Sequence, residues 1–184
     1  MKKWRKAYTL ACSLIAMMLM LAGCGETKVN TVEQTLAEAE EINNNSELCM
    51  DFLQLSTLSE EQAKRYNDDQ PELEFTDDGC VTGYYYRYPS IEGERRLTQI
   101  SIIGGNYHVF GICTGGSIDA AVNTLTQRGY EEIELTIQYN GLSMRAFQKY
   151  DVIIRIETTA DSSVIRSIQL YVDAQSSQQQ GYRQ

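Results

Sequence analysis

The chain has a single histidine, His108, and the nearest cysteine, Cys113, follows five residues later. A cysteine thiolate beside a histidine base is a nucleophile that can attack a carbonyl carbon. Such pairs usually come from distant segments that meet in the fold, whereas His108 and Cys113 share one stretch that begins extended. A lone histidine beside Tyr107 and Val109 is typical of a structural residue. We therefore interpret His108 as structural.

Other catalytic patterns are missing from the sequence. It has no Gly-x-Ser-x-Gly turn, no glycine-rich phosphate loop and no group of histidines with zinc-ligand spacing. Two carboxylates could act together on a glycosidic bond, but 25 acidic residues give no reason to select a pair. We expect a protein that is not an enzyme and that needs no cofactor.

Acidic side chains are concentrated between residues 68 and 78, and carboxylate oxygens are the ligands that calcium prefers. The acidic residues are Asp68, Asp69, Glu72, Glu74, Asp77 and Asp78. Their spacing lacks the alternating ligands and the central glycine of an EF-hand loop. We interpret this stretch as a solvated linker and expect no metal site.

The beginning of the chain carries the pattern of an export signal. Four basic residues at positions 2, 3, 5 and 6 precede the uncharged stretch 7–22. This stretch of 16 residues is shorter than a membrane-spanning helix, which needs about 20. Its end, Leu21-Ala22-Gly23-Cys24, resembles the lipobox of bacterial lipoproteins more than an ordinary signal peptide. The resemblance implies cleavage of residues 1–23 and attachment of two acyl chains to Cys24.

Lipidation of Cys24 would place the chain on the extracytoplasmic face of a cell membrane. Two acyl chains hold a protein firmly, because a single chain gives only marginal binding. Loss of residues 1–23 removes four positive charges and changes the net charge from −9 to −13. Such an acidic surface repels nucleic acid, so we expect no nucleic-acid partner. Residues 24–30 would form a short polar tether.

Three cysteines remain after Cys24, and three cannot all pair within one chain. One arrangement is a single disulfide with one thiol left over. The other is that Cys49, Cys80 and Cys113 are all reduced and buried. We favour the second, because the cysteine spacings match no metal site or redox pair.

The elements that would position these residues begin with helices. Capping residues and apolar periodicity predict amino-terminal helices that start near Thr31, Ser46 and Ser59. The apolar face of the first would include Leu36. A fourth helix would follow the N-cap Ser117 and end before a glycine at position 129.

Strands are predicted where apolar and polar residues alternate. The expected strands are 79–88, 97–103, 133–139, 142–148, 152–157 and 164–172. Asn140-Gly141 is a strong hairpin signal between two of them. Residues 31–174 are therefore predicted to form an α+β domain: amino-terminal helices, then a helix packed on a twisted antiparallel sheet. The glutamine-rich and serine-rich tail 175–184 has almost nothing to bury and is predicted to be disordered.

The first and last hairpins repeat one pattern with a constant shift of 68 residues. The shift places residues 84–88 on 152–156. It also places Leu97, Ile100 and Ile102 on Ile165, Ile168 and Leu170. The overlay suggests two tandem units, each a helix with a hairpin, at residues 46–104 and 107–172.

The overlay also predicts which side chains face solvent. It puts the row Tyr84, Tyr86 and Tyr88 on the core face, and it leaves Tyr85, Arg87 and Arg155 on the solvent face. Tyrosine and arginine are enriched at binding hot spots. Tyr85, Arg87 and Arg155 are therefore the predicted contact residues.

The segment Gly111-Ile112-Cys113-Thr114-Gly115-Gly116-Ser117, continued by Ala121-Val122-Asn123-Thr124-Leu125, resembles part of a known module. The similar unit occurs in beta-lactamase-inhibitor-protein-like modules and in small envelope lipoproteins of the outer-membrane assembly type. The resemblance covers residues 107–172 and extends less closely to 46–104. It implies a capped helix on a twisted antiparallel sheet and an activity of protein binding.

The resulting expectation is a lipid-anchored binding module that recognises a protein at the cell envelope. A lipoprotein that binds a small ligand or a glycan is the alternative, and a weak hydrolase is the third. The alternatives would each require a pocket.

Overall fold

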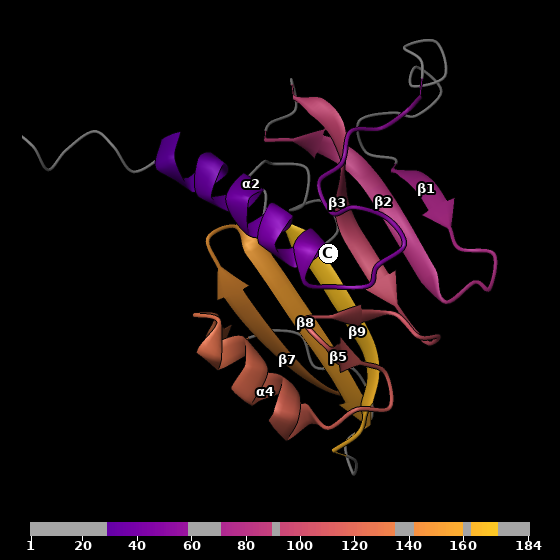
Figure 1. Ribbon diagram of the computed structural model, residues 1–184, viewed down its shortest axis with the longest axis vertical. Helices are drawn as coiled ribbons and strands as arrows, with labels where there is room; N and C mark the ends of the chain where they lie inside the picture. Colours follow the sequence, from indigo (N-terminus) through magenta and orange to yellow (C-terminus); the bar gives the residue numbers. More distant parts are fainter. Residues whose placement is uncertain (1–28, 59–70, 90–92, 135–141, 160–162, 173–184) are drawn as a thin grey trace, which may run out of the picture.

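An antiparallel sheet of seven strands is the largest element of the computed structural model, which describes residues 29–58, 71–89, 93–134, 142–159 and 163–172 (Figure 1). The spatial order of the strands is β1-β2-β3-β9-β8-β7-β6. The strands are β1 (Glu72–Phe75), β2 (Val81–Tyr88), β3 (Glu94–Ile102), β6 (Glu131–Ile133), β7 (Leu142–Lys149), β8 (Val152–Thr159) and β9 (Ile165–Val172). A separate small hairpin pairs β4 (His108–Val109) with β5 (Ile112–Cys113).

The predicted α+β class is wrong, because the described residues are mainly β. They contain two short helices, α2 (Val29–Asn44) and α4 (Ile118–Gln127), against one large antiparallel sheet. The helix predicted from Ser46 does not form. Cys49 and Leu53 both have a φ of 61°, which a right-handed helix cannot contain. The third predicted helix, from Ser59, falls in 59–70, outside the described residues.

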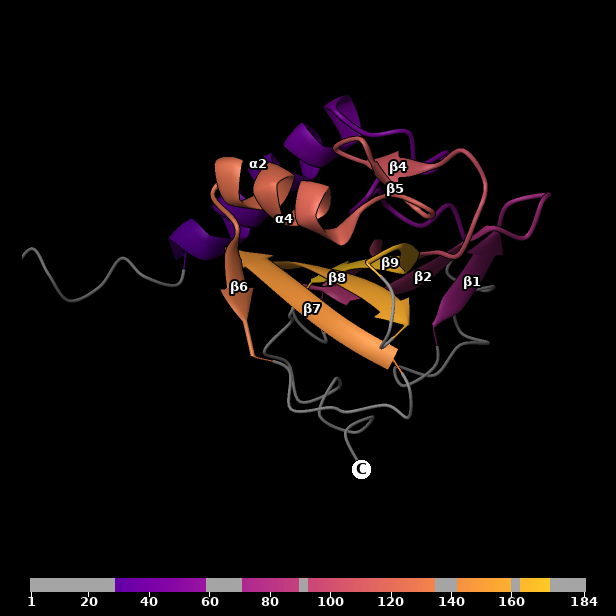
Figure 2. The same ribbon diagram turned by 90° about the horizontal axis from the view of Figure 1, so that it is seen from below.

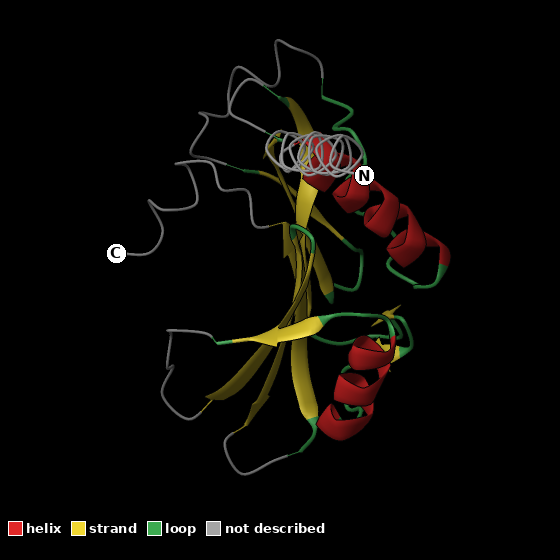
Figure 3. Ribbon diagram, turned by 90° about the vertical axis from the view of Figure 1, so that its left-hand side faces the viewer, coloured by secondary structure: helices red, strands yellow, loops and turns green. Residues whose placement is uncertain are grey.

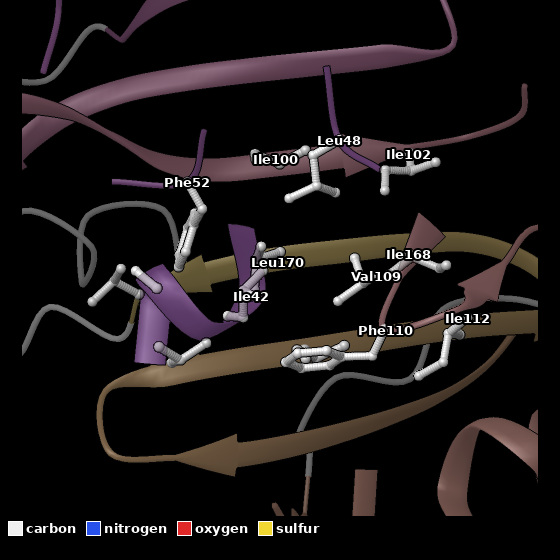
Figure 4. Packing of buried hydrophobic residues seen from close by; sticks show 14 of the residues in the cluster. Ile42, Leu48, Phe52, Ile100, Ile102, Val109, Phe110, Ile112, Ile168 and Leu170 are labelled. Carbon is white, nitrogen blue, oxygen red and sulfur yellow. The ribbon is translucent and has the colours of Figure 1, made fainter. Parts of the chain in front are cut away.

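Segment 46–58 is instead an irregular stretch that joins the covering layer of the sheet. Both helices lie on one face of the sheet (Figures 2 and 3), and the β4–β5 hairpin lies on this face as well. Figure 4 shows the contacts between the covering layer and the sheet. Its labelled residues are Ile42, Leu48, Phe52, Val109, Phe110 and Ile112 from the covering layer and Ile100, Ile102, Ile168 and Leu170 from the sheet. None of the described helices has the length and apolar character needed to cross a membrane.

The first predicted helix forms as α2, but it begins at Val29, before the predicted cap Thr31, and its buried face differs from the predicted one. Leu36 is 38% exposed. Thr35, Glu38, Ala39 and Ile42 are buried in its place, at helical spacing. Two polar residues therefore lie on the face that packs on the sheet.

Helix α4 confirms the predicted start and end signals. Ser117 is the N-cap residue, although its side chain makes no capping hydrogen bond. Gly129 has a φ of 82°, a conformation that residues with a Cβ rarely adopt. The Tyr130 amide then donates to the Leu125 carbonyl at 3.0 Å, and the Gly129 amide donates to the Thr126 carbonyl at 3.0 Å. These two bonds are the Schellman motif.

The two central strands are related by a local two-fold axis. Ile100 pairs with Leu170, and Ile102 pairs with Ile168, with Ser101 opposite Gln169 between them. The 68-residue shift exchanges the members of these pairs, as a two-fold axis requires. The same shift relates two bulges: Thr98 has no partner in β2, and residue 166 has none in β8. The shift is therefore correct for β3 and β9.

The same shift is wrong for β2 and β8. Tyr84 pairs with Gln99 in the first hairpin, and Glu157 pairs with Ser167 in the second. The residue equivalent to Tyr84 is thus Glu157, 73 residues later, because the first hairpin is longer by five residues. Five is an odd number, so the ungapped overlay reversed the faces of Tyr84 and Tyr85. Tyr88, beyond the bulge, is 2% exposed and lies in the core as predicted.

Several predicted features lie outside the described residues. These are the leader 1–23 with Cys24, the Asn140-Gly141 turn and the tail 175–184. The strand predicted at 133–139 is described only at its start, because β6 ends at Ile133 and the description stops at residue 134. The return strand of that hairpin, β7, and both strands of the last hairpin form as predicted.

Candidate functional site

Tyr85 is a core residue, so its predicted place on the solvent face is wrong. Its side chain is 3% exposed. The Tyr85 hydroxyl donates to Glu74 Oε2 at 2.5 Å and accepts from Gln54 Nε2 at 2.7 Å. Burial, together with the hydrogen bond to the Glu74 carboxylate, raises the pKa of Tyr85. The phenol therefore stays protonated and serves to hold β1 and segment 46–58 against β2.

Arg87 and Arg155 are partly exposed, but the structure does not bring them together. They lie on β2 and β8, and two strands, β3 and β9, separate them. Arg87 Nη1 donates to the Gly93 carbonyl at 3.1 Å, across the end of the hairpin. Arg155 forms an ion pair with Glu157 at 3.5 Å and a hydrogen bond with Gln169. Their role in binding stays a prediction.

The face of the sheet opposite the helices carries a different row of side chains. Side chains alternate between faces, so Gln99 points away from the core that contains Ile100. The cross-strand partners of Gln99 are Tyr84 on β2 and Tyr171 on β9. Because strands are about 4.8 Å apart, Tyr84 and Tyr171 are separated by about 10 Å. No described helix covers this open face (Figure 3).

The row ends at an exposed apolar patch on the first edge of the sheet. Leu73 pairs with Tyr84, and Phe75 pairs with Thr82, so these four residues share the open face. Leu73 is 46% exposed and Phe75 is 61% exposed. We call these four residues the β1–β2 patch. Exposed apolar surface next to a tyrosine is typical of a protein-binding site.

The surroundings of the patch are acidic. Residues 71–80 contain Glu72, Glu74, Asp77 and Asp78 and no basic residue. The Asp78 carboxylate accepts hydrogen bonds from Thr76 and from the Cys80 amide, and these bonds lower the pKa of Asp78. The patch is therefore apolar with an acidic border.

His108 and Cys113 lie closer together than the sequence suggested, because they are direct partners in the β4–β5 hairpin. The Gly111 amide donates to His108 Nδ1 at 3.2 Å, which occupies the lone pair that a general base would use. His108 Nε2 lies 3.6 Å from Glu47 Oε2. This arrangement connects segment 46–58 to the hairpin and gives no activation of the thiol.

The described cysteines are unpaired, but the prediction that they are buried is wrong. Cys49 is exposed, and Cys80 and Cys113 are partly exposed. Burial of part of each side chain and the nearby Asp78 carboxylate raise the pKa of Cys49 and Cys80. Across the described ranges, no group of three or more histidine, cysteine or acidic side chains is placed to hold a metal ion.

A buried polar cluster on α2 was not predicted from the sequence. Glu38 is 5% exposed and accepts a hydrogen bond from the Tyr130 hydroxyl at 2.8 Å. Lys149 Nζ lies 2.5 Å from the other Glu38 oxygen. Near the carboxyl end of α2, Glu41 pairs with Arg128, whose Nη1 lies 3.2 Å from the Glu41 carboxylate. The sequence signal for this cluster is weak: Glu38 lies beside Ala39 and four residues before Ile42, on a stripe that also contains the polar residue Thr35.

Comparisons with protein-family models, with curated proteins and with solved structures find no match for this chain. The function is therefore argued from the geometry of the surface.

Proposed function

We propose that this protein is a lipid-anchored binding module that recognises a protein partner at the cell envelope through the β1–β2 patch. The observation that carries the proposal is the pair Leu73 and Phe75, exposed beside Tyr84 on a sheet face that no described helix covers. Burial of these side chains by a partner would remove apolar surface from water, which is the main driving force of association.

The proposed anchor is the lipid on Cys24. The lipobox-like sequence Leu21–Cys24 and the four basic residues before the apolar stretch support it. Helix α2 starts at Val29, so the domain would stand close to the membrane surface. A Cys24→Ser variant should move from the detergent phase to the aqueous phase in a detergent phase-partition assay. Retention of that variant in the detergent phase would contradict lipidation at Cys24.

A glycan ligand is the second candidate, and the row Tyr84, Gln99 and Tyr171 favours it. This row offers two aromatic rings and hydrogen-bonding groups without charge. We place it second because the apolar end of the open face has the larger exposed fraction.

The test is photo-crosslinking in intact cells. A photo-reactive residue replaces Tyr84, and the control replaces Thr126, an exposed residue of α4 on the opposite face. We expect an adduct with one envelope protein from position 84 and none from position 126. Phe75→Ser should reduce the adduct at least tenfold, whereas Leu36→Ser, which changes an exposed apolar residue of α2, should not. Equal adducts from positions 84 and 126 would refute the proposed surface.

A further inference from the structure

The local two-fold axis shows that one strand position beside β1 is empty in the described structure. In the first hairpin Leu73 pairs with Tyr84, and in the second Met144 pairs with Glu157, so β1 is equivalent to β7. Strand β6 covers the outer edge of β7. Strand β1 ends the sheet, and no described strand pairs with its outer edge (Figure 1).

The chain segment that could fill this position is used elsewhere. Strand β6 follows α4 directly, so its counterpart would follow α2, in segment 46–58. This segment instead runs along the extended end of β3. The Leu53 amide donates to the Leu97 carbonyl at 2.9 Å, and the Ser56 amide donates to the Arg95 carbonyl at 2.9 Å. Among the described residues, no strand pairs with the outward backbone groups of β1, and such groups are the template that an added strand needs.

The side chains of β1 alternate strictly in character. Leu73 and Phe75 lie on the open face, and Glu72 and Glu74 lie on the face of the helices. The two carboxylates are held at the edge by hydrogen bonds. Glu72 Oε2 accepts from Ser56 Oγ at 2.6 Å, and Glu74 Oε2 accepts from Tyr85 at 2.5 Å.

A second copy of this chain is a poor partner for the edge. If β1 pairs antiparallel with β1 of a second copy, the open faces of the two copies lie on the same side. The registers that pair most of the strand then place at least one glutamate of each copy opposite a glutamate. One register pairs Glu72 with Glu74 of the other copy, and the next pairs Glu74 with Glu74. Like charges directly opposite each other destabilise a strand pair.

We infer that β1 accepts an extended segment of the partner protein as an eighth, antiparallel strand of the sheet, in which apolar residues alternate with lysine or arginine. The inference rests on the proposed function and specifies how the β1–β2 patch is occupied. Apolar side chains of the segment lie beside Leu73 and Phe75. Basic side chains lie beside Glu72 and Glu74, where opposite charges across strands stabilise the pair.

A peptide titration followed by nuclear magnetic resonance tests the inference. The protein is the chain from residue 24 onward with Cys24→Ser, and the probe is an eight-residue peptide of alternating valine and lysine. We expect shifts of the backbone amides of residues 72–75. A valine and glutamate peptide should bind at least tenfold more weakly. The variant Glu72→Lys should weaken binding of the lysine peptide and strengthen binding of the glutamate peptide.

Backbone methylation separates strand addition from contact through side chains alone. Two further peptides carry N-methyl groups on alternate amides, one set directed toward β1 and the other directed away. We expect one of them to lose at least tenfold in affinity and the other to bind like the parent peptide. Equal binding of both, or no shift at residues 72–75 with any peptide, overturns the inference. An adduct from position 84 in cells would then still support the proposed function, and loss of that adduct as well would refute both.

Discussion

At the residue scale, Glu38 has the most unusual surroundings. A buried carboxylate is costly unless it is paired and hydrogen-bonded, and Glu38 has both Lys149 and Tyr130. Burial of the Tyr130 side chain and its contact with the Glu38 carboxylate raise the pKa of Tyr130, so the phenol stays protonated and donates the hydrogen bond. The cluster fixes α2 against β7 and against the end of α4. Both elements belong to the second of the two related halves of the chain.

Tyr130→Phe should lower the free energy of unfolding by about 1.5–3 kcal/mol, because a buried carboxylate loses one hydrogen bond. Urea denaturation followed by circular dichroism measures this change. Tyr150→Phe is the control, because Tyr150 is 41% exposed, and its effect should stay within about 0.5 kcal/mol. Equal effects of the two substitutions would mean that the hydrogen bond to Glu38 contributes nothing.

Tyr88 gives a prediction for alkaline pH. Burial, helped by the Asp151 carboxylate, raises the pKa of Tyr88 to about 12. An unfolded tyrosine has a pKa near 10, so the folded chain binds more protons between these values. The stabilisation is complete below pH 10 and is lost as the pH rises toward 12. Stability measured by urea denaturation should fall over this window, and it should fall less steeply in Tyr88→Phe.

At the element scale, local signals predicted α4 correctly, and tertiary contacts overrode the local signals of segment 46–58. The caps of α4 are made by residues next to the helix, so the sequence contains them. Leu48 and Phe52 have helical spacing, but both are buried against the sheet from a segment that is not helical, because Cys49 and Leu53 have positive φ. The face of Tyr85 could not be predicted, because it depends on the length of a loop that leads to another strand.

Gly129 tests the end signal of α4. A Cβ at this position would meet no atom within 4 Å, so the effect of a substitution comes from the backbone alone. Gly129→Ala should lower the free energy of unfolding by about 1 kcal/mol, because alanine resists a φ of 82°. Gly129→Asn should cost less, since asparagine tolerates the left-handed region. Thermal unfolding ranks the two variants, and the reverse order would contradict this reason.

At the scale of the whole molecule, the pairing of β3 with β9 joins two related halves into one sheet. The sequence predicted the hairpins, and it predicted the 68-residue shift that relates β3 to β9. It did not predict that these strands pair, because strand order depends on contacts between distant segments. It also could not place Leu73 and Phe75, whose exposure follows from the edge position of β1.

Ile168→Ala should lower the stability of both halves together. Ile168 is fully buried beside the axis, and this truncation costs about 2–5 kcal/mol in a packed core. Hydrogen exchange should show faster opening of β2 and of β8 alike. Val164→Ala, at a position 48% exposed, is the control and should leave both rates unchanged. Faster exchange in β8 alone would indicate two independent halves.

The attachment of α2 across the sheet has a mechanical consequence. A tether at residue 24 and a partner on β1 would pull the domain from two sides. Tension from such a tether would enter through α2 and pass to β7 and α4 through the contacts of Glu38 and Glu41. Tension from a partner would enter at β1, near the opposite edge of the sheet from β7. The load between these two points would pass through the hydrogen bonds of every strand between β1 and β7, so the sheet would resist it as one unit.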